Sequence, residues 1–390
     1  MRRFFTILAS LRLTVIVFAL SIFLIFAGTL AQVHQGIWTV VDAYFRSLIV
    51  TIEFQIFVPK SIATIPGGFW FPGGLTLGII MFVNLIAAHI VRFKFTKKRM
   101  GIIITHFGVI LLLAGEFVTG IAAREGNMTI VEGESSNYTE DSRSTELAII
   151  DRSGKEDNVV VVVPDTVLEF KSGELKHELL PFSMSIQEWM PNSFILGPEQ
   201  NQGKRRGIAD SGSANIYAAQ PTAVVSGVEG STVDYPSMYV SFTKNNETIG
   251  TYLLSAYLEK PQAVFVDGKT YWVELRFARS YKPYTVHLID FKHDLFTGTQ
   301  TARNYSSLVQ LLDTERNVDR EVLISMNNPL RYAGETFYQA SFLQDDSGTV
   351  LQVVKNPGWL MPYASCTLIT IGMLIQFGTR LISTLRKSAS

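Results

Sequence analysis

Four stretches of the chain are almost free of charged residues and are long enough to cross a membrane. They cover residues 11–33, 73–93, 101–123 and 358–381. A membrane-spanning helix needs about 20 consecutive, mainly apolar residues. The pattern therefore predicts four transmembrane helices. We interpret the first as an uncleaved anchor, because its apolar run is too long for the core of a signal peptide.

Residues 124–356 have the pattern of a β-rich domain. Short β-branched and aromatic runs, such as 159–163, 238–242, 271–277 and 285–291, alternate with Asp, Asn, Gly and Lys turns. Asp267-Gly268 between two of these runs is typical of a tight hairpin turn. We expect a large extracytoplasmic all-β domain of the sandwich kind.

Residues 37–57 mix aromatic and aliphatic residues with Asp42, Arg46 and Glu53. This mixture favours a helix that lies in the outer membrane interface rather than one that crosses the bilayer. The predicted organisation is then a membrane region over 1–123 with three spans and this interfacial helix. A β-rich domain over 124–356 follows, and 357–390 form the fourth span and a cytoplasmic tail.

The formal net charge is zero, but the charges are unevenly distributed. The N-terminus, the loop after the second span and the C-terminal tail carry Lys and Arg and no Asp or Glu. Short loops rich in Lys and Arg stay on the cytoplasmic side. The pattern predicts a multi-pass protein of the cell inner (plasma) membrane, with both termini cytoplasmic and the β domain outside.

Motifs of soluble enzymes are missing from the sequence. It contains no Walker loop, no GxSxG, no HExxH and no GxGxxG after a strand. The one cysteine, Cys366, excludes a disulfide within the chain and any CxxC redox site. We expect a lipid bilayer around the protein and no nucleic-acid partner.

Two of the six histidines, His89 and His106, lie inside predicted spans. An ionisable residue in a span marks a functional site by default, because its burial in hydrocarbon is costly. Both lie on the order of 7 Å inside the cytoplasmic boundary at 1.5 Å per residue. Neutral imidazole is a haem-iron ligand, and an apolar helix bundle can hold a porphyrin. The alternative is a structural histidine bonded to a neighbouring helix, as we also expect of Asn84.

Residues 326–339 read MNNPLRYAGETFYQ, which resembles the signature MNxPLRYxGxTFYQ of the ResB/CcsB family of System II cytochrome c biogenesis proteins. Residues 288–291, LIDF, and 353–358, VVKNPG, fit the same family. So do LRLT at 11–14 and EGE at 132–134. The resemblance extends over nearly the whole chain, including the order of three spans, outer domain and last span.

The resemblance implies a subunit of a cytochrome c synthetase, a haem lyase complex that is not active through this chain alone. Such proteins work with a CcsA/ResC-like membrane partner. Together they move haem b across the membrane and attach it to the CxxCH thiols of an apocytochrome c. The partner carries a tryptophan-rich haem-handling segment, whereas the five tryptophans of this chain are dispersed.

The resemblance also implies a transmembrane histidine that ligates haem iron, and His89 is the match. His106 is the alternative or second ligand, and we assign no catalytic residue. Arg92 or Lys94 is expected to meet a haem propionate. The competing interpretation is a haem-free scaffold that presents the apocytochrome to the partner, with residues 326–339 as either a client contact or a structural turn.

Overall fold

The structure is a computed structural model, and the side chains of residues 34, 92, 170, 295 and 302 are outside its description. The residues that it describes are 7–60, 62–92, 96, 99–154, 158–170, 173–200, 208–224, 233–258, 260–296, 298, 302–343 and 345–388.

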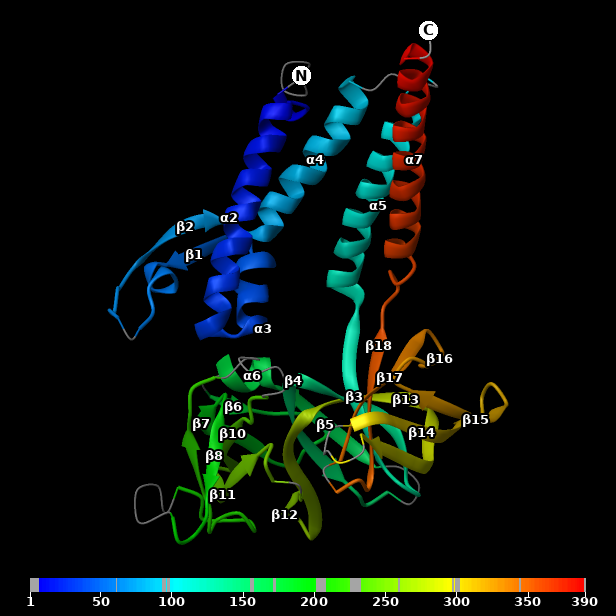
Figure 1. Cartoon of the computed structure of the whole chain (residues 1–390). Coiled ribbons are helices and arrows are strands. Elements are labelled where there is room, and N and C mark those ends of the chain that lie inside the picture. Colours follow the sequence, from blue (N-terminus) through cyan, green and yellow to red (C-terminus); the bar gives the residue numbers. More distant parts are fainter. Residues whose placement is uncertain are drawn as a thin grey trace.

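Among the described residues, four helices are long and apolar enough to cross a membrane, and together with the β domain they confirm the predicted fold class. They are α2 (Leu11–Gln35), α4 (Gly74–Arg92), α5 (Met100–Ala122) and α7 (Met361–Ser388). In Figure 1 the start of α2 and the end of α7 lie at one end of the helices, the terminal end. The β domain lies beyond the opposite end, the domain end.

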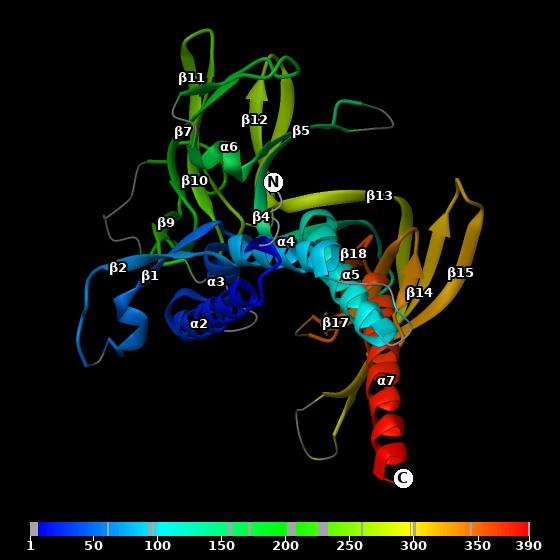
Figure 2. The same ribbon diagram turned by 90° about the horizontal axis from the view of Figure 1, so that it is seen from above.

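The helices form two pairs. α2 packs on α4, and α5 packs along its length on α7. The two pairs meet where the chain passes from α4 to α5 at the terminal end, and they diverge toward the β domain (Figure 1). Seen along the helices, α7 lies far from α2 (Figure 2). The spans therefore form two helix pairs that separate toward the β domain, rather than one closed four-helix bundle.

The predicted interfacial helix over 37–57 is wrong beyond its first half. Ile37–Val40 is helix α3, and Val41–Phe45 continues as a π-helical turn. Ile49–Glu53 is instead strand β1, which pairs with β2 (Gly68–Pro72) in an antiparallel hairpin. β-Branched Ile49, Val50, Thr51 and Ile52 favour a strand, and their burial alternates between the two faces, as in a half-buried strand.

The β domain follows α5 after Ala123 and returns to α7 through the short turn 356–360. Its first part consists of β3 (Arg124–Val131), β4 (Ser135–Asp151), β5 (Val159–Pro164), α6 (Asp165–Phe170), β6 (Glu174–Leu175), β7 (Ser183–Met190), β8 (Ser193–Leu196) and β9 (Ala218–Pro221). It continues with β10 (Ser237–Lys244), β11 (Glu247–Ser255), β12 (Gln262–Val266), β13 (Lys269–Leu295) and β14 (Ala302–Asp313). It ends with β15 (Val318–Ser325), β16 (Leu330–Tyr332), β17 (Glu335–Phe342) and β18 (Gly348–Lys355).

The domain has two lobes that share the long strands β4 and β13, and they lie side by side in Figure 2. In the first lobe, the sheet β11-β10-β7-β6 covers the second half of β4 and the first half of β13 around a core that includes Leu147, Phe242 and Val273. In the second, the large sheet curls until its end strands β15 and β16 are in contact. Its core includes Met128, Leu288 and Phe337.

The runs 271–277 and 285–291 were expected as two strands but belong to the single strand β13. Lys282 and Pro283 lie between them, where the pairing of β13 with β4 slips between Tyr281 and Val286. Proline has no N–H to donate, and such a slip is the place in a sheet that tolerates it. The hairpin turn at Asp267-Gly268 is confirmed, with positive φ at both residues.

Candidate functional site

Asn84 holds α4 against α2. Its side chain is 3% exposed, and its Oδ1 accepts a hydrogen bond of 2.7 Å from the Thr14 hydroxyl. Its Nδ2 donates to the backbone carbonyls of Leu8 and Ser10 at the start of the first span. The expected role of Asn84 as a polar contact between helices is confirmed, and this contact fixes the face that α4 turns toward α5.

The backbones of α5 and α7 approach each other closely, and this contact holds the pair together. Gly101, Gly108 and Gly115 recur every seven residues on the buried face of α5. They lie against Gly372, Ser365 and Met361 of α7. Small residues allow helices to approach closely within a membrane, so α5 is anchored to α7 and presents His106 on another side.

His89 of α4 and His106 of α5 lie together at the terminal end of the spans. The centroids of their imidazole rings are 5.0 Å apart, and the ring planes meet at 67°. Both side chains are half-buried, and the atoms Nε2 of His89 and Nδ1 of His106 are buried. The sequence predicted that the two histidines lie at a similar depth in the membrane, and in the structure their rings are in direct contact.

The His89 ring has a defined orientation. Its Nδ1 lies 2.8 Å from the carbonyl oxygen of Leu85, one helical turn earlier. A carbonyl oxygen only accepts hydrogen bonds, so Nδ1 carries the proton and donates. In the neutral ring, the lone pair of electrons is then on Nε2. A metal-binding histidine is commonly fixed in this way, with its other nitrogen bonded to a backbone carbonyl.

The two rings together do not enclose space for an iron atom. Imidazoles that ligate one metal from opposite sides have ring centroids about 6 Å apart, because each metal–nitrogen bond is about 2 Å. A separation of 5.0 Å with edge-to-face rings is ring-to-ring contact. The geometry excludes ligation of one iron by both rings at once, and such a pair of bonds would require α4 and α5 to separate.

The remaining expected site residues lie elsewhere or outside the described parts. The side chain of Arg92 and the whole of Lys94 are outside the described residues, as is the side chain of His34. In the β domain, His287 bonds to Ser135 at 3.1 Å and His293 pairs with Asp346 at 3.0 Å. Both contacts are structural and lie away from the spans.

Residues 326–339 form the end of the second lobe. Leu330 and Phe337 are in its core, and Ala333-Gly334 form the turn between β16 and β17 with positive φ at both residues. Arg331 lies 4.6 Å over the ring of Trp359, just before α7. These contacts favour the structural interpretation of the segment, which holds the last strands against the start of the fourth span.

A buried polar group around Glu335 was not predicted from the sequence. Glu335 accepts from Lys282 Nζ at 2.6 Å and from the Tyr284 hydroxyl. Burial, followed by the bond to Glu335, raises the pKa of the Tyr284 hydroxyl. Lys282 and Tyr284 belong to the irregular part of β13, and no sequence motif links them to position 335.

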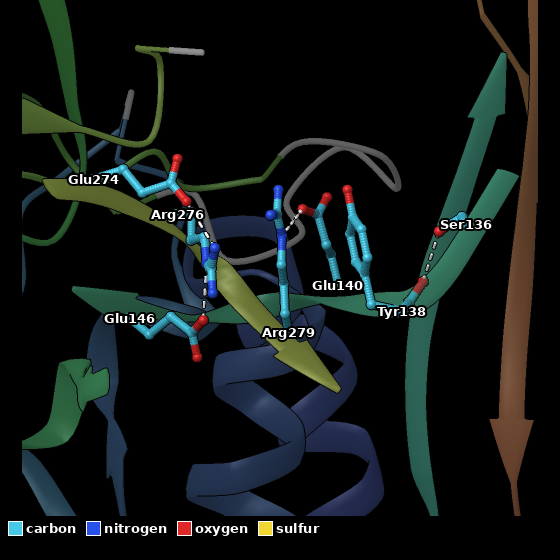
Figure 3. Close-up of polar contacts among 7 residues, drawn as sticks. All are labelled: Ser136, Tyr138, Glu140, Glu146, Glu274, Arg276 and Arg279. Atoms are coloured by element: carbon cyan, nitrogen blue, oxygen red, sulfur yellow. Dashed lines mark hydrogen bonds and ion pairs between the residues drawn. The ribbon is translucent and has the colours of Figure 1, made fainter. Parts of the chain in front are cut away.

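A second unpredicted group lies where β13 pairs with β4 (Figure 3). Arg276 is 8% exposed and reaches Glu146 at 2.9 Å and Glu274 at 2.7 Å. Next to it, Arg279 reaches Glu140 at 2.9 Å and lies 4.3 Å over the ring of Tyr138. The carboxylates are engaged with arginines, so this cluster joins the two strands between the lobes.

Comparison with known proteins relates the chain to one family. The model of the ResB-like family matches residues 262–350, which run from β12 into β18 and include most of the second lobe. Protein NrfI of Wolinella succinogenes is 34% identical over 92 residues, which are 24% of this chain and 10% of NrfI. The chain thus matches only a small share of that longer relative.

A solved structure of Cytochrome c Heme Lyase CcmF aligns with 78% of this chain and 30% of that chain, with 9% identity. Its TM-score is 0.22, and at that value the likeness supports no conclusion. The family assignment rests on the sequence match, which contains the segment 326–339 and the Glu335 group. The match relates residues 262–350 of this chain to the ResB-like family, and over that range it confirms the predicted resemblance to the ResB/CcsB proteins.

Proposed function

We propose that this protein is a subunit of a System II cytochrome c synthetase that takes part in haem delivery across the membrane. In this proposal it acts with a CcsA/ResC-like membrane partner, and the pair attaches haem to the CxxCH thiols of apocytochrome c. The family match and the four apolar helices support a membrane role in cytochrome c biogenesis. The observation that carries the haem role is the His89–His106 pair within the spans.

In the proposal, haem is cargo, and His89 holds its iron through Nε2. The bond from Nδ1 to the Leu85 carbonyl orients the ring and keeps the electron pair on Nε2. The iron site would lie near the end of α4 and the start of α5, among residues that exclude water. His106 begins as a neighbour of the ligand and becomes a second ligand only when the two helix pairs separate.

The proposed orientation places the terminal end of the spans in the cytoplasm of the cell and the β domain outside its inner (plasma) membrane. It follows from the Lys and Arg residues at the chain ends and in the α4–α5 loop. Arg92 and Lys94 then belong to the cytoplasmic edge, where a haem propionate would need a cation. If Arg92→Ala and Lys94→Ala leave both bound haem and cytochrome maturation unchanged, this propionate contact is refuted.

The test is an absorption spectrum of the complex co-purified with its CcsA/ResC-like partner. Wild type, His89→Ala and His106→Ala are compared, with His177→Ala in the β domain as a matched control. We expect His89→Ala to weaken or shift the Soret band and added imidazole to restore it, and His177→Ala to leave the band unchanged.

An unchanged band in both span variants would assign the haem to the partner. The chain would then be the haem-free scaffold that holds the apocytochrome near the partner's site. Loss in His106→Ala alone would keep the haem role and move the ligand from α4 to α5.

A further inference from the structure

The β1–β2 hairpin has one face against α2 and one exposed apolar face. Val50 and Ile52 point inward and are buried. Phe69 and Phe71 pack on Phe23 of α2 with ring centroids 6.3 and 5.1 Å away. The opposite face carries Ile49, which is 66% exposed, Trp70, which is 82% exposed, and exposed Thr51 opposite Trp70, and it ends at Glu53. Leu48, just before the strand, is 58% exposed.

The depth of the hairpin follows from its contact with α2. Phe23 is twelve residues after Leu11, so at 1.5 Å per residue it lies about 18 Å along the helix. The hydrocarbon core is about 30 Å thick. If Leu11 lies near one boundary, the hairpin lies within about 12 Å of the other boundary, the one next to the β domain.

The neighbouring surface of α2 is apolar and exposed over the same stretch of the helix. Ile22, Ile25 and Phe26 are each more than half exposed. The hairpin leads through Pro72 directly into α4, whose first residue is Gly74. Its far end, with Glu53 and exposed Lys60, points toward the side of the β domain (Figure 1). Apolar residues are thus at bilayer depth, and charged residues are directed away from it.

The backbone limits how deep this face can lie. The outer edges of a two-stranded sheet have N–H and C=O groups that hydrocarbon cannot satisfy. The boundary between acyl chains and headgroups contains water and is the position that tryptophan favours. We infer that the face formed by Leu48, Ile49 and Trp70 inserts into lipid at this boundary, on the side of the β domain.

The test uses the full chain in nanodiscs, with one fluorescent label on an engineered cysteine. Cys366→Ser removes the native thiol. Trp70→Cys carries the label on the hairpin, and Ile25→Cys carries it on the span. Phe265→Cys is the matched control, because Phe265 is also an exposed strand residue, at 70%, but lies in β12 at the far side of the β domain. Size-exclusion profiles and circular dichroism identify any variant that is not folded.

The lipid is phosphatidylcholine with a nitroxide placed either near the headgroup or near the chain end. We expect the label at position 70 to be quenched more strongly by the shallow nitroxide than by the deep one. The label at 265 should be unaffected by both, and the label at 25 should be quenched. A label at 70 that behaves like the one at 265 overturns the inference. So does a label at 70 that is shielded from both nitroxides and from aqueous iodide, because a protein would then cover the face.

Discussion

Gly108 of α5 lies directly against Ser365 of α7. A Cβ atom at position 108 would be 2.9 Å from the Ser365 carbonyl oxygen and 2.7 Å from the side chain of Ile369. Contacts this short require a shift of the backbone of one helix. The α5–α7 pair therefore depends on the absence of a side chain at this position.

Gly108→Ala should weaken this pair by about 1–3 kcal/mol, the usual cost of overpacking a close contact. The expected readout is a lower midpoint of thermal aggregation for the detergent-solubilised protein. Gly120→Ala in the same helix is the control, because a Cβ there meets no atom within 4 Å. Equal effects of the two substitutions would show that helix propensity, and not packing, controls the result.

Asn84→Ala should loosen α4 from α2 by about 1 kcal/mol, the scale measured for polar contacts between spans. The substitution removes the acceptor for Thr14 and the donor to the Leu8 and Ser10 carbonyls. Proteolysis or thermal aggregation in detergent provides the measurement. Ile79→Ala, on the exposed side of the same helix, should leave the midpoint close to that of wild type.

Glu335→Gln should destabilise the β domain strongly. Lys282 and Glu335 are 11% and 8% exposed, and the substitution leaves a buried ammonium without its carboxylate. Breaking a buried pair from one side costs about 3 kcal/mol or more. Urea unfolding of the full chain, followed by tryptophan fluorescence, measures the loss. Asp290→Asn breaks the exposed pair with Lys292 and should leave the urea midpoint close to that of wild type, because solvent screens this pair.

Acid should weaken the second lobe through Asp313. The Tyr332 hydroxyl donates to Asp313 at 2.6 Å, and this bond, with that from the Arg316 N–H, lowers the pKa of the carboxyl group. The folded-state pKa is then below the unfolded value of about 3.9. The stabilisation is present above that unfolded value and is lost as the pH falls through the lowered folded-state pKa.

Tyr332→Phe should reduce this acid sensitivity, because it removes the first of these donors. The measurement is the difference in urea midpoint between neutral pH and acid pH, for wild type and variant. An identical difference in both proteins would mean that Tyr332 does not set the pKa of Asp313.

The sequence predicted the spans well, because the thickness of the bilayer's hydrocarbon core sets the length of the apolar run that each span needs. The expected span 73–93 and the helix Gly74–Arg92 differ by one residue at each end. The depth of His89 and His106 also followed from counting. Their ring contact did not, because it depends on how α4 and α5 are rotated, and Asn84 and the α5 glycines decide that rotation.

The outer hairpin was missed for a local reason. Alternation of apolar residues over 49–53 is too short to distinguish from one face of a helix. Its identity as a strand depends on pairing with Phe69, Trp70 and Phe71, which follow a loop that Gln55 closes with hydrogen bonds to Val58, Ala63 and Ile65. The Glu335 group was missed because it joins positions more than fifty residues apart.

Two neighbouring strands carry the chain out of the membrane and back. β3 continues α5, β18 leads into α7, and the two strands are paired from Arg124–Lys355 to Val131–Gly348. Two helices held together at glycines are thus joined to a hydrogen-bonded ribbon in the large sheet, through Ala123 on one side and the short turn 356–360 on the other. We expect the paired strands to resist twisting, so that the β domain and the α5–α7 pair rotate together as one body. A bound partner that rotates the domain would then move His106 on α5. His89 would stay in place, because α4 is held against α2, so the distance between the two rings would change.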